Sequence, residues 1–223
     1  MNYTDIAKAL GITKGRVSQI RATAPPAERA FFGVGPVAVG VPYRYQTTDR
    51  ERPLVAAEDA QAGELATALL TSLGFATSSL QFGPETTELP PGDLLVICGP
   101  KSAPAARDLL AEDAALSFID YDGRWYIQDH TTGTRHASST DGPERSSVDL
   151  AYLGRHVRHG RVVVHVAGIH AIGSLGALHY LANQLPNLYS RAPTDSSLSL
   201  AVAVRYRGLT AESVELLCGP HVS

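Results

Sequence analysis

Apolar runs alternate with helix-compatible segments along most of the chain. Continuous apolar strands followed by helices are typical of a mostly parallel sheet that is covered on both faces. The pattern therefore predicts an α/β fold, a three-layer sandwich over residues 53–223. Three strand-and-helix pairs carry this prediction: 53–59 with 63–75, 93–100 with 102–113, and 161–168 with 175–185, where Pro186 is expected to end the last helix.

Two further segments alternate between apolar and polar residues, as antiparallel hairpins do. Residues 118–133 alternate around Asp122 and Gly123, a dipeptide that favours a two-residue hairpin turn. Residues 197–219 alternate around Gly208 and are expected to form a strand pair at an edge of the sheet. The polar stretch 136–149 has no period and is interpreted as a mobile loop.

The first 23 residues have a different, helical pattern. Apolar positions recur at helical spacing over two short segments, and Gly11 between them suits a tight turn. Thr13 stands where its hydroxyl can cap the second helix. This stretch, residues 3–23, resembles the region-four type helix-turn-helix of bacterial sigma factors and of many small repressors. The resemblance rests on Ala7, Gly11, Ile12, Val17 and Ile20.

In proteins with this motif the second helix enters the major groove of DNA. The resemblance therefore implies that DNA is a partner and that arginine and glutamine side chains read purine edges, whereas Lys14 contacts the phosphate backbone and Thr13 lies near a phosphate. The side chains expected at DNA are those of Thr13, Lys14, Arg16, Ser18, Gln19 and Arg21.

The motif departs from the family in one respect. A third helix normally precedes the two-helix unit, and here only Met1 and Asn2 come before Tyr3. Short helices are marginal without tertiary packing, so we expect the body or a second subunit to support them. A homodimer that reads two half-sites is the main expectation. The other interpretation is a helical hairpin that serves for packing, in a scaffold protein.

Residues 24–52 are expected to connect the two parts. Pro25 and Pro26 open this segment, and no sustained period follows. Exposed Phe31 and Phe32 would be a liability, so the segment is predicted to be an arm packed on the body, with one strand over residues 37–43. The predicted domains are thus residues 1–23, the arm at 24–52 and a ligand-sensing domain at 53–223.

Composition and charge narrow the function. The chain has 223 residues, of which 44% are hydrophobic and 18% charged, as in an ordinary soluble protein. Two cysteines are too few for a disulfide framework, and no basic and apolar leader is visible, so a cytoplasmic location is expected. Residues 1–32 carry five basic and two acidic side chains, although the net charge is −3. A basic head on an acidic body favours contact of nucleic acid with the head alone.

The uncharged stretch 162–185 allows three interpretations. A membrane helix needs about 20 apolar residues, but histidines and glycines interrupt this stretch, so no membrane span is expected. A nucleophile elbow needs glycine two residues before the serine, and Ile172 stands there before Ser174. A strand-to-helix turn remains, whose backbone N–H groups at a helix N-terminus suit an anion.

A second turn of this kind follows the strand at 93–100, and strand ends of open α/β sheets are where ligands bind. We therefore expect a small anionic ligand, a nucleotide being one candidate. The alternative is that the glycines only allow the helix to pack closely on the sheet. The residues expected to bind the ligand are Gly99, Lys101, Ser102, Gly168, His170, Gly173, Ser174 and Gly176.

Titratable residues supply candidates for catalysis. His170 lies in the glycine turn and suits ligand contact or proton transfer, whereas His165 is expected in the core and His156 in a solvated turn. Glu58 and Asp59 suit a base or a ribose-binding pair, or are solvated acids at a helix start. No pair of histidines has cysteine or carboxylate neighbours at zinc spacing, so neither a metal site nor a cofactor is expected.

Three functions therefore stay open. The leading hypothesis is a transcription regulator whose α/β domain senses a small anionic ligand. The second is a nucleotide-processing hydrolase or glycosidase, with Glu58 or Asp59 as base and His170 as acid. The third is a scaffold protein with a degenerate helix-turn-helix.

Overall fold

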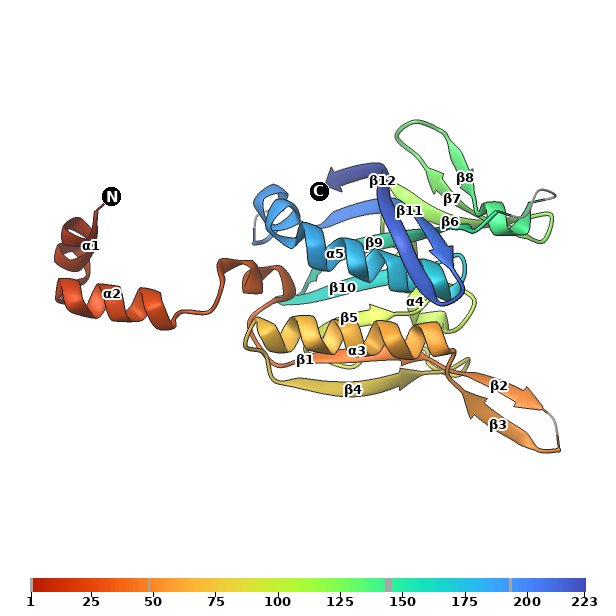
Figure 1. Ribbon diagram of the computed structural model, residues 1–223, viewed down its shortest axis with the longest axis horizontal. Coiled ribbons are helices and arrows are strands. Elements are labelled where there is room, and N and C mark those ends of the chain that lie inside the picture. Colours follow the sequence, from red (N-terminus) through yellow and green to blue (C-terminus); the bar gives the residue numbers. More distant parts are fainter. Residues whose placement is uncertain (1, 48, 143–145, 193) are drawn as a thin grey trace.

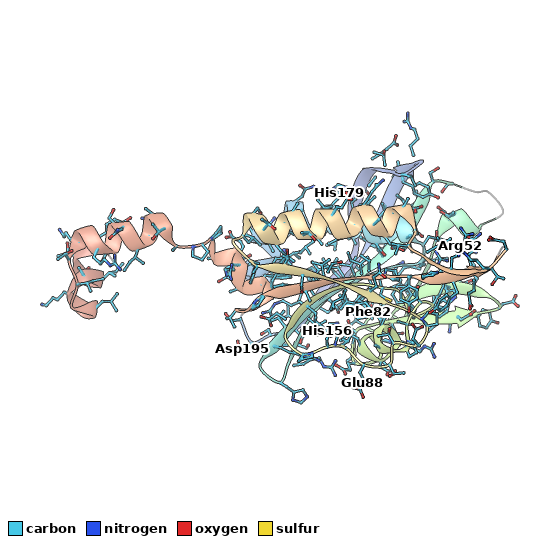
Figure 2. The ribbon with its side chains drawn as sticks, turned by 90° about the horizontal axis from the view of Figure 1, so that it is seen from below. Arg52, Phe82, Glu88, His156, His179 and Asp195 are labelled. Atoms are coloured by element: carbon cyan, nitrogen blue, oxygen red, sulfur yellow. The ribbon has the colours of Figure 1, made fainter. Side chains whose placement is uncertain are left out.

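The structure is a computed structural model, and it describes residues 2–47, 49–142, 146–192 and 194–223. Figure 1 shows two parts, a pair of helices near the N-terminus and an α/β body. The two helices stand clear of the body in Figure 2 as well. The elements of the head and the arm are α1 (Tyr3–Leu10), α2 (Lys14–Thr23) and the 3₁₀ helix η1 (Ala27–Phe32).

A mixed sheet of seven strands organises the body, in the order β12-β11-β9-β10-β5-β1-β4. The pairs β1–β4, β1–β5 and β5–β10 are parallel, and the strands from β10 through β12 pair antiparallel. This arrangement confirms the predicted α/β class. Its strands and helices are β1 (Val37–Pro42), α3 (Ala57–Ser72), β4 (Thr77–Phe82), β5 (Asp93–Ile97), α4 (Pro104–Ala111), β9 (Val148–Arg158), β10 (Arg161–Gly168), α5 (Ala171–Arg191), β11 (Leu198–Arg207) and β12 (Thr210–Val222).

Small antiparallel elements decorate the body. Strands β2 (Arg44–Thr47) and β3 (Glu51–Leu54) form a two-stranded sheet. Strands β6 (Leu116–Tyr121), β7 (Arg124–Asp129) and β8 (Arg135–Ala137) form a three-stranded sheet, and the 3₁₀ helix η2 (Ser139–Asp141) follows. The β6–β7 turn is the predicted hairpin, with positive φ at Asp122 and Gly123. The predicted edge pair around Gly208 is β11 with β12, and β12 is the sheet edge.

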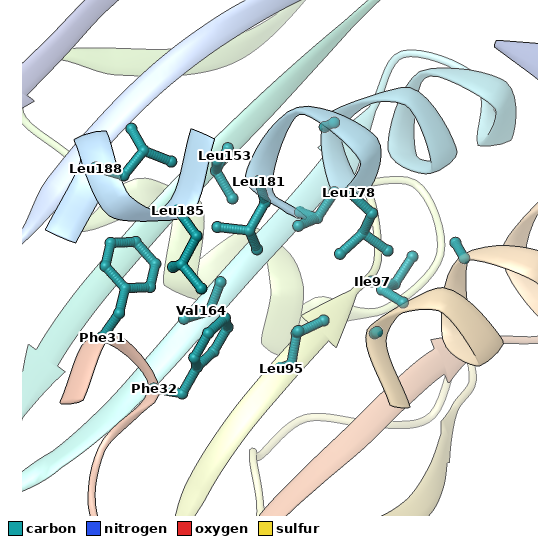
Figure 3. Close-up of a cluster of buried hydrophobic side chains, with 14 of the residues drawn as sticks. Phe31, Phe32, Leu95, Ile97, Leu153, Val164, Leu178, Leu181, Leu185 and Leu188 are labelled. Atoms are coloured by element: carbon teal, nitrogen blue, oxygen red, sulfur yellow. The ribbon is translucent and has the colours of Figure 1, made fainter. Parts of the chain in front are cut away.

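Side chains alternate between the two faces of the sheet and so build two cores. On β5, Leu95 and Ile97 face the cluster that α3 and α5 complete, whereas Leu94 and Val96 face α4. Figure 3 shows the first cluster, where Leu181 of α5 packs near the sheet. The three-stranded sheet covers the α4 side as well. Helices, sheet and a mixed helix-and-sheet layer therefore make three layers.

Helix α5 continues through Pro186 to Arg191, although a proline was expected to end it. Leu185 and Leu188 on either side of the proline are buried in the main core. Burial of that apolar seam outweighs the backbone hydrogen bond that the proline removes.

Segment 53–59 is not the strand that its apolar run predicted. Its first residues end the exposed strand β3, and residues from Ala57 onward begin helix α3. The strand of the seven-stranded sheet that comes before α3 along the chain is β1, which the sequence analysis placed in the arm. Strand β1 lies inside the sheet between β5 and β4, and Phe31 before it is 1% exposed. The arm is thus packed, as expected, and it contributes a central strand.

Strand β9 and the burial of His156 also differ from expectation. The predicted loop 136–149 contains the end of β8, all of η2 and the start of β9, while residues 143–145 lie outside the described residues. His156 lies within the body (Figure 2), only 7% exposed, and its Nε2 is 3.0 Å from the Tyr152 hydroxyl. Because Arg155, His156 and Arg158 are polar, the sequence pattern did not indicate the strand β9, which forms a hairpin with β10 and also pairs with the more distant β11. His165, by contrast, is fully buried as predicted.

Among the described residues, no helix combines the length and the apolar character that crossing a membrane requires.

Candidate functional site

A cleft opens where the carboxyl ends of β1, β5 and β10 meet. Helix α3, after β1, packs on one face of the sheet, and helix α4, after β5, packs on the other. The connections from two neighbouring strands therefore leave in opposite directions, and such a switch point is where open α/β sheets bind ligands. The cleft has a volume of about 290 Å³. Its lining is Pro42, Arg44, Ala56, Glu58, Asp59, Gly99, Lys101, Ser102, Gly168, Ile169, His170, Ala171 and Ser174.

Most of the predicted ligand-binding residues meet in this cleft. Six of the eight line it, and both candidate catalytic acids join them from the first turn of α3. The two that are not in the lining, Gly173 and Gly176, lie deeper in helix α5. A Cβ at Gly176 would come within 2.3 Å of Val204 on β11, so this glycine allows close packing of helix on sheet.

The two turns that form the cleft approach each other closely. A Cβ on Gly99 would lie 3.3 Å from the Gly168 carbonyl oxygen, and a Cβ on Gly168 would clash with the His170 carbonyl. Glycine at both positions lets the β5–α4 and β10–α5 turns lie side by side and bring Lys101 to the Ile169 carbonyl, which its Nζ reaches at 3.1 Å.

A buried carboxylate of the protein binds part of the N-terminus of α5. The Asp149 carboxylate, 0% exposed, accepts hydrogen bonds from the backbone N–H groups of His170 at 3.0 Å and Gly173 at 3.1 Å. The Gly168 N–H donates to the Ser174 hydroxyl oxygen at 2.8 Å. We expected these backbone N–H groups to bind an anionic ligand. Instead they donate to side-chain oxygens of the protein itself.

His170 lies between two carboxylates. Its Nδ1 is 2.9 Å from Asp149 Oδ1, and its Nε2 is 3.1 Å from Asp141 Oδ1. The hydrogen bond to Asp149 raises the pKa of His170 above its ordinary value, against the opposing effect of partial burial, and both carboxylates contribute to the increase. The arrangement favours the imidazolium form and orients both ring nitrogens.

Lys101 and His170 also line a second cavity of about 710 Å³ beside the cleft. Arg124, Trp125 and Asp141 contribute to its wall, and the Lys101 ammonium lies 5.4 Å from the centre of the Trp125 ring. Partial burial lowers the pKa of Lys101. With Arg44 in the cleft, cationic groups occupy both cavities, which suits a polar ligand that carries negative charge.

Asp59 has the most perturbed carboxyl of the cleft. It is 6% exposed, and this burial raises its pKa to about 7, against the lowering effect of the nearby Arg44. A carboxyl that titrates near neutral pH inside a cleft can donate or accept a proton during a reaction, or bind a ligand in a protonation-dependent way.

The sequence did not single out Asp149, Asp141, Arg44 or Trp125. Asp149 and Asp141 both lie in the stretch 136–149, which was interpreted as a mobile loop, and Asp149 precedes His170 by 21 residues. Arg44 follows a strand that was assigned to the arm. Only the hairpin signal at Asp122–Gly123 marked the neighbourhood of Trp125.

The head presents its predicted DNA-facing residues to solvent. Thr13, Lys14, Arg16, Ser18, Gln19 and Arg21 are all exposed. The Thr13 hydroxyl caps α2 by accepting from the Arg16 N–H at 3.1 Å, as expected. The Arg16 guanidinium donates to Gln19 Oε1 at 2.8 Å, and the Arg21 guanidinium lies 5.5 Å from the centre of the Tyr3 ring.

Comparison with models of known protein families finds none that matches this chain, and comparison with curated protein sequences finds no relative.

Proposed function

We propose that the protein is a transcription regulator, in which a two-helix unit binds DNA and the α/β body senses a small anionic ligand. The observation that carries this proposal is the exposure of the whole predicted reading surface of α2 on a head that stands clear of the body (Figure 1). Burial of Arg16, Gln19 and Arg21 would have favoured the scaffold alternative. Since its target is the chromosome, the protein acts in the cytoplasm.

The head supports a dimeric regulator. Only Ala7 and Val17 are buried in the two helices, whereas Leu10 is 65% exposed and Ile20 46% exposed. Two short helices with so small a core need more apolar contact. A second copy supplies this contact in our proposal, and two copies of α2 then read two half-sites.

The body supports the sensing role. Its cleft lies at the switch point of the sheet and combines Arg44, Lys101 and His170, whose pKa the Asp149 carboxylate raises, with the acids Glu58 and Asp59. Cations bind phosphate or carboxylate groups, and acids accept hydrogen bonds from hydroxyl groups such as those of a ribose. A nucleotide offers both kinds of group.

Fluorescence anisotropy tests the DNA-binding part. The purified protein is titrated onto the duplex upstream of its own coding sequence and onto a scrambled duplex, at about 0.15 M salt. We expect selective binding to the first duplex. The variant Arg16→Ala should weaken it by about tenfold or more, because an arginine contact to a base is worth about 1–3 kcal/mol.

The matched control is Arg107→Ala, which removes the same charge from an exposed position on α4 of the body. It should leave DNA affinity unchanged. Equal weak binding of both duplexes, or equal losses in the two variants, would contradict a specific role of the head.

A second candidate function is catalysis on a nucleotide in the same cleft. The observation that favours it is the carboxyl of Asp59, whose pKa of about 7 suits a general base at neutral pH, with His170, whose pKa is raised, as the acid. Incubation with a panel of nucleotides, followed by chromatography of the products, tests it. Turnover that Asp59→Asn abolishes would establish the enzyme, and no turnover of any compound would exclude that panel as substrates.

A further inference from the structure

Three potential metal ligands converge away from the cleft. Asp129 ends strand β7 of the three-stranded sheet, while Cys218 and His221 belong to the edge strand β12. The carboxylate oxygen, the thiol sulfur and the imidazole nitrogen lie within 4.8 Å of one another. None of the three lines the cleft or the cavity beside it, as far as the described residues show.

A bulge in the β11–β12 ladder brings the two β12 side chains together. Positions three apart on a regular strand point to opposite faces. Here Cys218 pairs with Ala201 and His221 pairs with Ser199, and the register shifts between these pairs. Three steps on β12 thus oppose two on β11, so both side chains share one face.

Gly219 makes the bulge feasible. Its φ is +86°, and a Cβ at this position would lie 2.8 Å from the Ser199 carbonyl oxygen, so another residue would be both strained and too close. The face that Cys218 and His221 share is the face that the three-stranded sheet covers, where Cys218 packs beside Ile127 and its neighbours. Asp129 follows Ile127 by two residues and meets them there.

Two of the three side chains have surroundings that suit a metal ligand. The Nε2 atom of His221 is buried and has no hydrogen-bond partner among the described residues, an arrangement that normally costs stability. The carboxylate of Asp129, 2% exposed, is oriented by three donors on Oδ1, namely the Thr131 N–H and hydroxyl and the Thr132 N–H, at 2.8, 2.7 and 3.3 Å. Such supporting hydrogen bonds are typical around metal ligands.

From this geometry we propose that Asp129, Cys218 and His221 bind a zinc-class divalent transition metal. Thiolate, imidazole and carboxylate together suit Zn²⁺ or Co²⁺, whereas Ca²⁺ and Mg²⁺ require oxygen ligands. Cys218 binds as thiolate and releases its proton to solvent. Three protein ligands leave the fourth tetrahedral position to water. The metal links the edge strand β12 to the three-stranded sheet, so it stabilises the contact between two elements distant in the sequence.

No zinc-like spacing along the chain includes Asp129, because the carboxylate lies on another sheet, far from Cys218 in the sequence. The pair Cys218 and His221 alone has the short spacing common among metal ligands, but the bulge that makes this spacing useful depends on the partner strand β11.

Cobalt titration tests the proposal on the full chain after treatment with a chelator. We expect a thiolate-to-cobalt charge-transfer band that saturates at one Co²⁺ per chain and disappears when Zn²⁺ is added. Cys218→Ser should abolish this band, and His221→Gln and Asp129→Asn should each weaken Co²⁺ binding by about tenfold or more. Cys98→Ala is the matched control, because Cys98 is the other cysteine and is buried in a different cluster. It should keep the band.

A second measurement uses the wild-type protein, so its result does not depend on whether the variants fold. Zn²⁺ should slow alkylation of Cys218 by iodoacetamide by about tenfold or more, because the metal-bound thiolate is occupied. Peptide mass spectrometry reads the labelling of each cysteine separately. Absence of a thiolate band at equimolar Co²⁺, persistence of the band in Cys218→Ser, or alkylation of Cys218 at the same rate with and without Zn²⁺ would each overturn the site.

Discussion

The head and the body differ in where their order comes from. In the head, capping groups next to the helices define both segments, with Asn2 and Thr13 at the N-termini and Gly11 at the turn, yet almost no apolar surface is buried. In the body, a two-sided core surrounds the sheet, and the cleft forms only when turns from three strands meet. Local signals therefore define the head, and long-range packing defines the site.

The largest effect we expect is on the core of the body. Leu181 of α5 is 0% exposed in the cluster of Figure 3. Leu181→Ala should lower the free energy of unfolding by about 2–5 kcal/mol, because it removes buried apolar contacts and leaves a cavity. Urea denaturation followed by circular dichroism measures this change. A loss below about 1 kcal/mol would contradict a tightly packed core at this position.

The next effect concerns Asp59, whose contribution to the free energy of unfolding depends on pH. Its pKa in the folded protein is about 7, above the ordinary 3.8, so the folded state holds the proton more tightly than the unfolded state. Stability from this group is therefore complete below about pH 3.8 and is lost as the pH rises through about 7.

Asp59→Asn removes the buried charge and should raise the free energy of unfolding at pH 8 by about 4 kcal/mol, with little effect near pH 4. Denaturation at the two pH values checks it, and Glu58→Gln is the neighbouring control. Equal effects of Asp59→Asn at both pH values would refute the raised pKa.

The pKa of His170 should fall when Asp149 loses its charge. Hydrogen bonding to Asp149 holds this pKa above 6.5, so the pair adds stability that is fully present below about pH 6.5 and is lost as the pH rises through the folded pKa. Asp149→Asn keeps the acceptor for the helix N-terminus and removes the charge. An NMR titration of the imidazole should show the decrease, and an unchanged pKa would assign the raised value to other groups.

The smallest effect on stability is expected in the head. Leu10→Ala alters an exposed side chain and should change the unfolding of the body by no more than about 0.5 kcal/mol. The same variant should weaken dimerisation and DNA binding, as light scattering and anisotropy would show. A large loss of body stability would mean that the head packs on the body in solution.

The contrast between head and body also explains what the sequence could predict. The hairpin at Asp122–Gly123 and the turn at Gly11 follow from local backbone chemistry, and the structure has both. Strand β9 was missed because Arg155 and His156 are polar, although both side chains are buried and the Arg155 guanidinium donates to the Phe31 carbonyl oxygen, 124 residues away. Strand β1 was placed in an arm because glycine and proline flank it, yet the sheet surrounds it on both sides.

The candidate site was predictable in its position and not in its chemistry. The turns after two apolar strands indicated the cleft, and Lys101 and His170 line it. The role of Asp149 depends on the β9–β10 pairing, which sets it beside the start of α5. The turn at His159 and Gly160, both with positive φ, joins these two strands, but strand β9 was not predicted. The helix N-terminus was therefore assigned to a ligand, whereas a buried carboxylate binds there.

Coupling between the two parts is the central claim, and one titration tests it directly. The protein is bound to its labelled upstream duplex, and anisotropy is followed while inorganic phosphate and nucleoside mono-, di- and triphosphates are added in turn, with Lys101→Ala in parallel. The account predicts that at least one nucleotide shifts DNA affinity in the wild-type protein and that the shift is lost in Lys101→Ala. A nucleotide that calorimetry shows to bind the body while DNA affinity stays constant would contradict it.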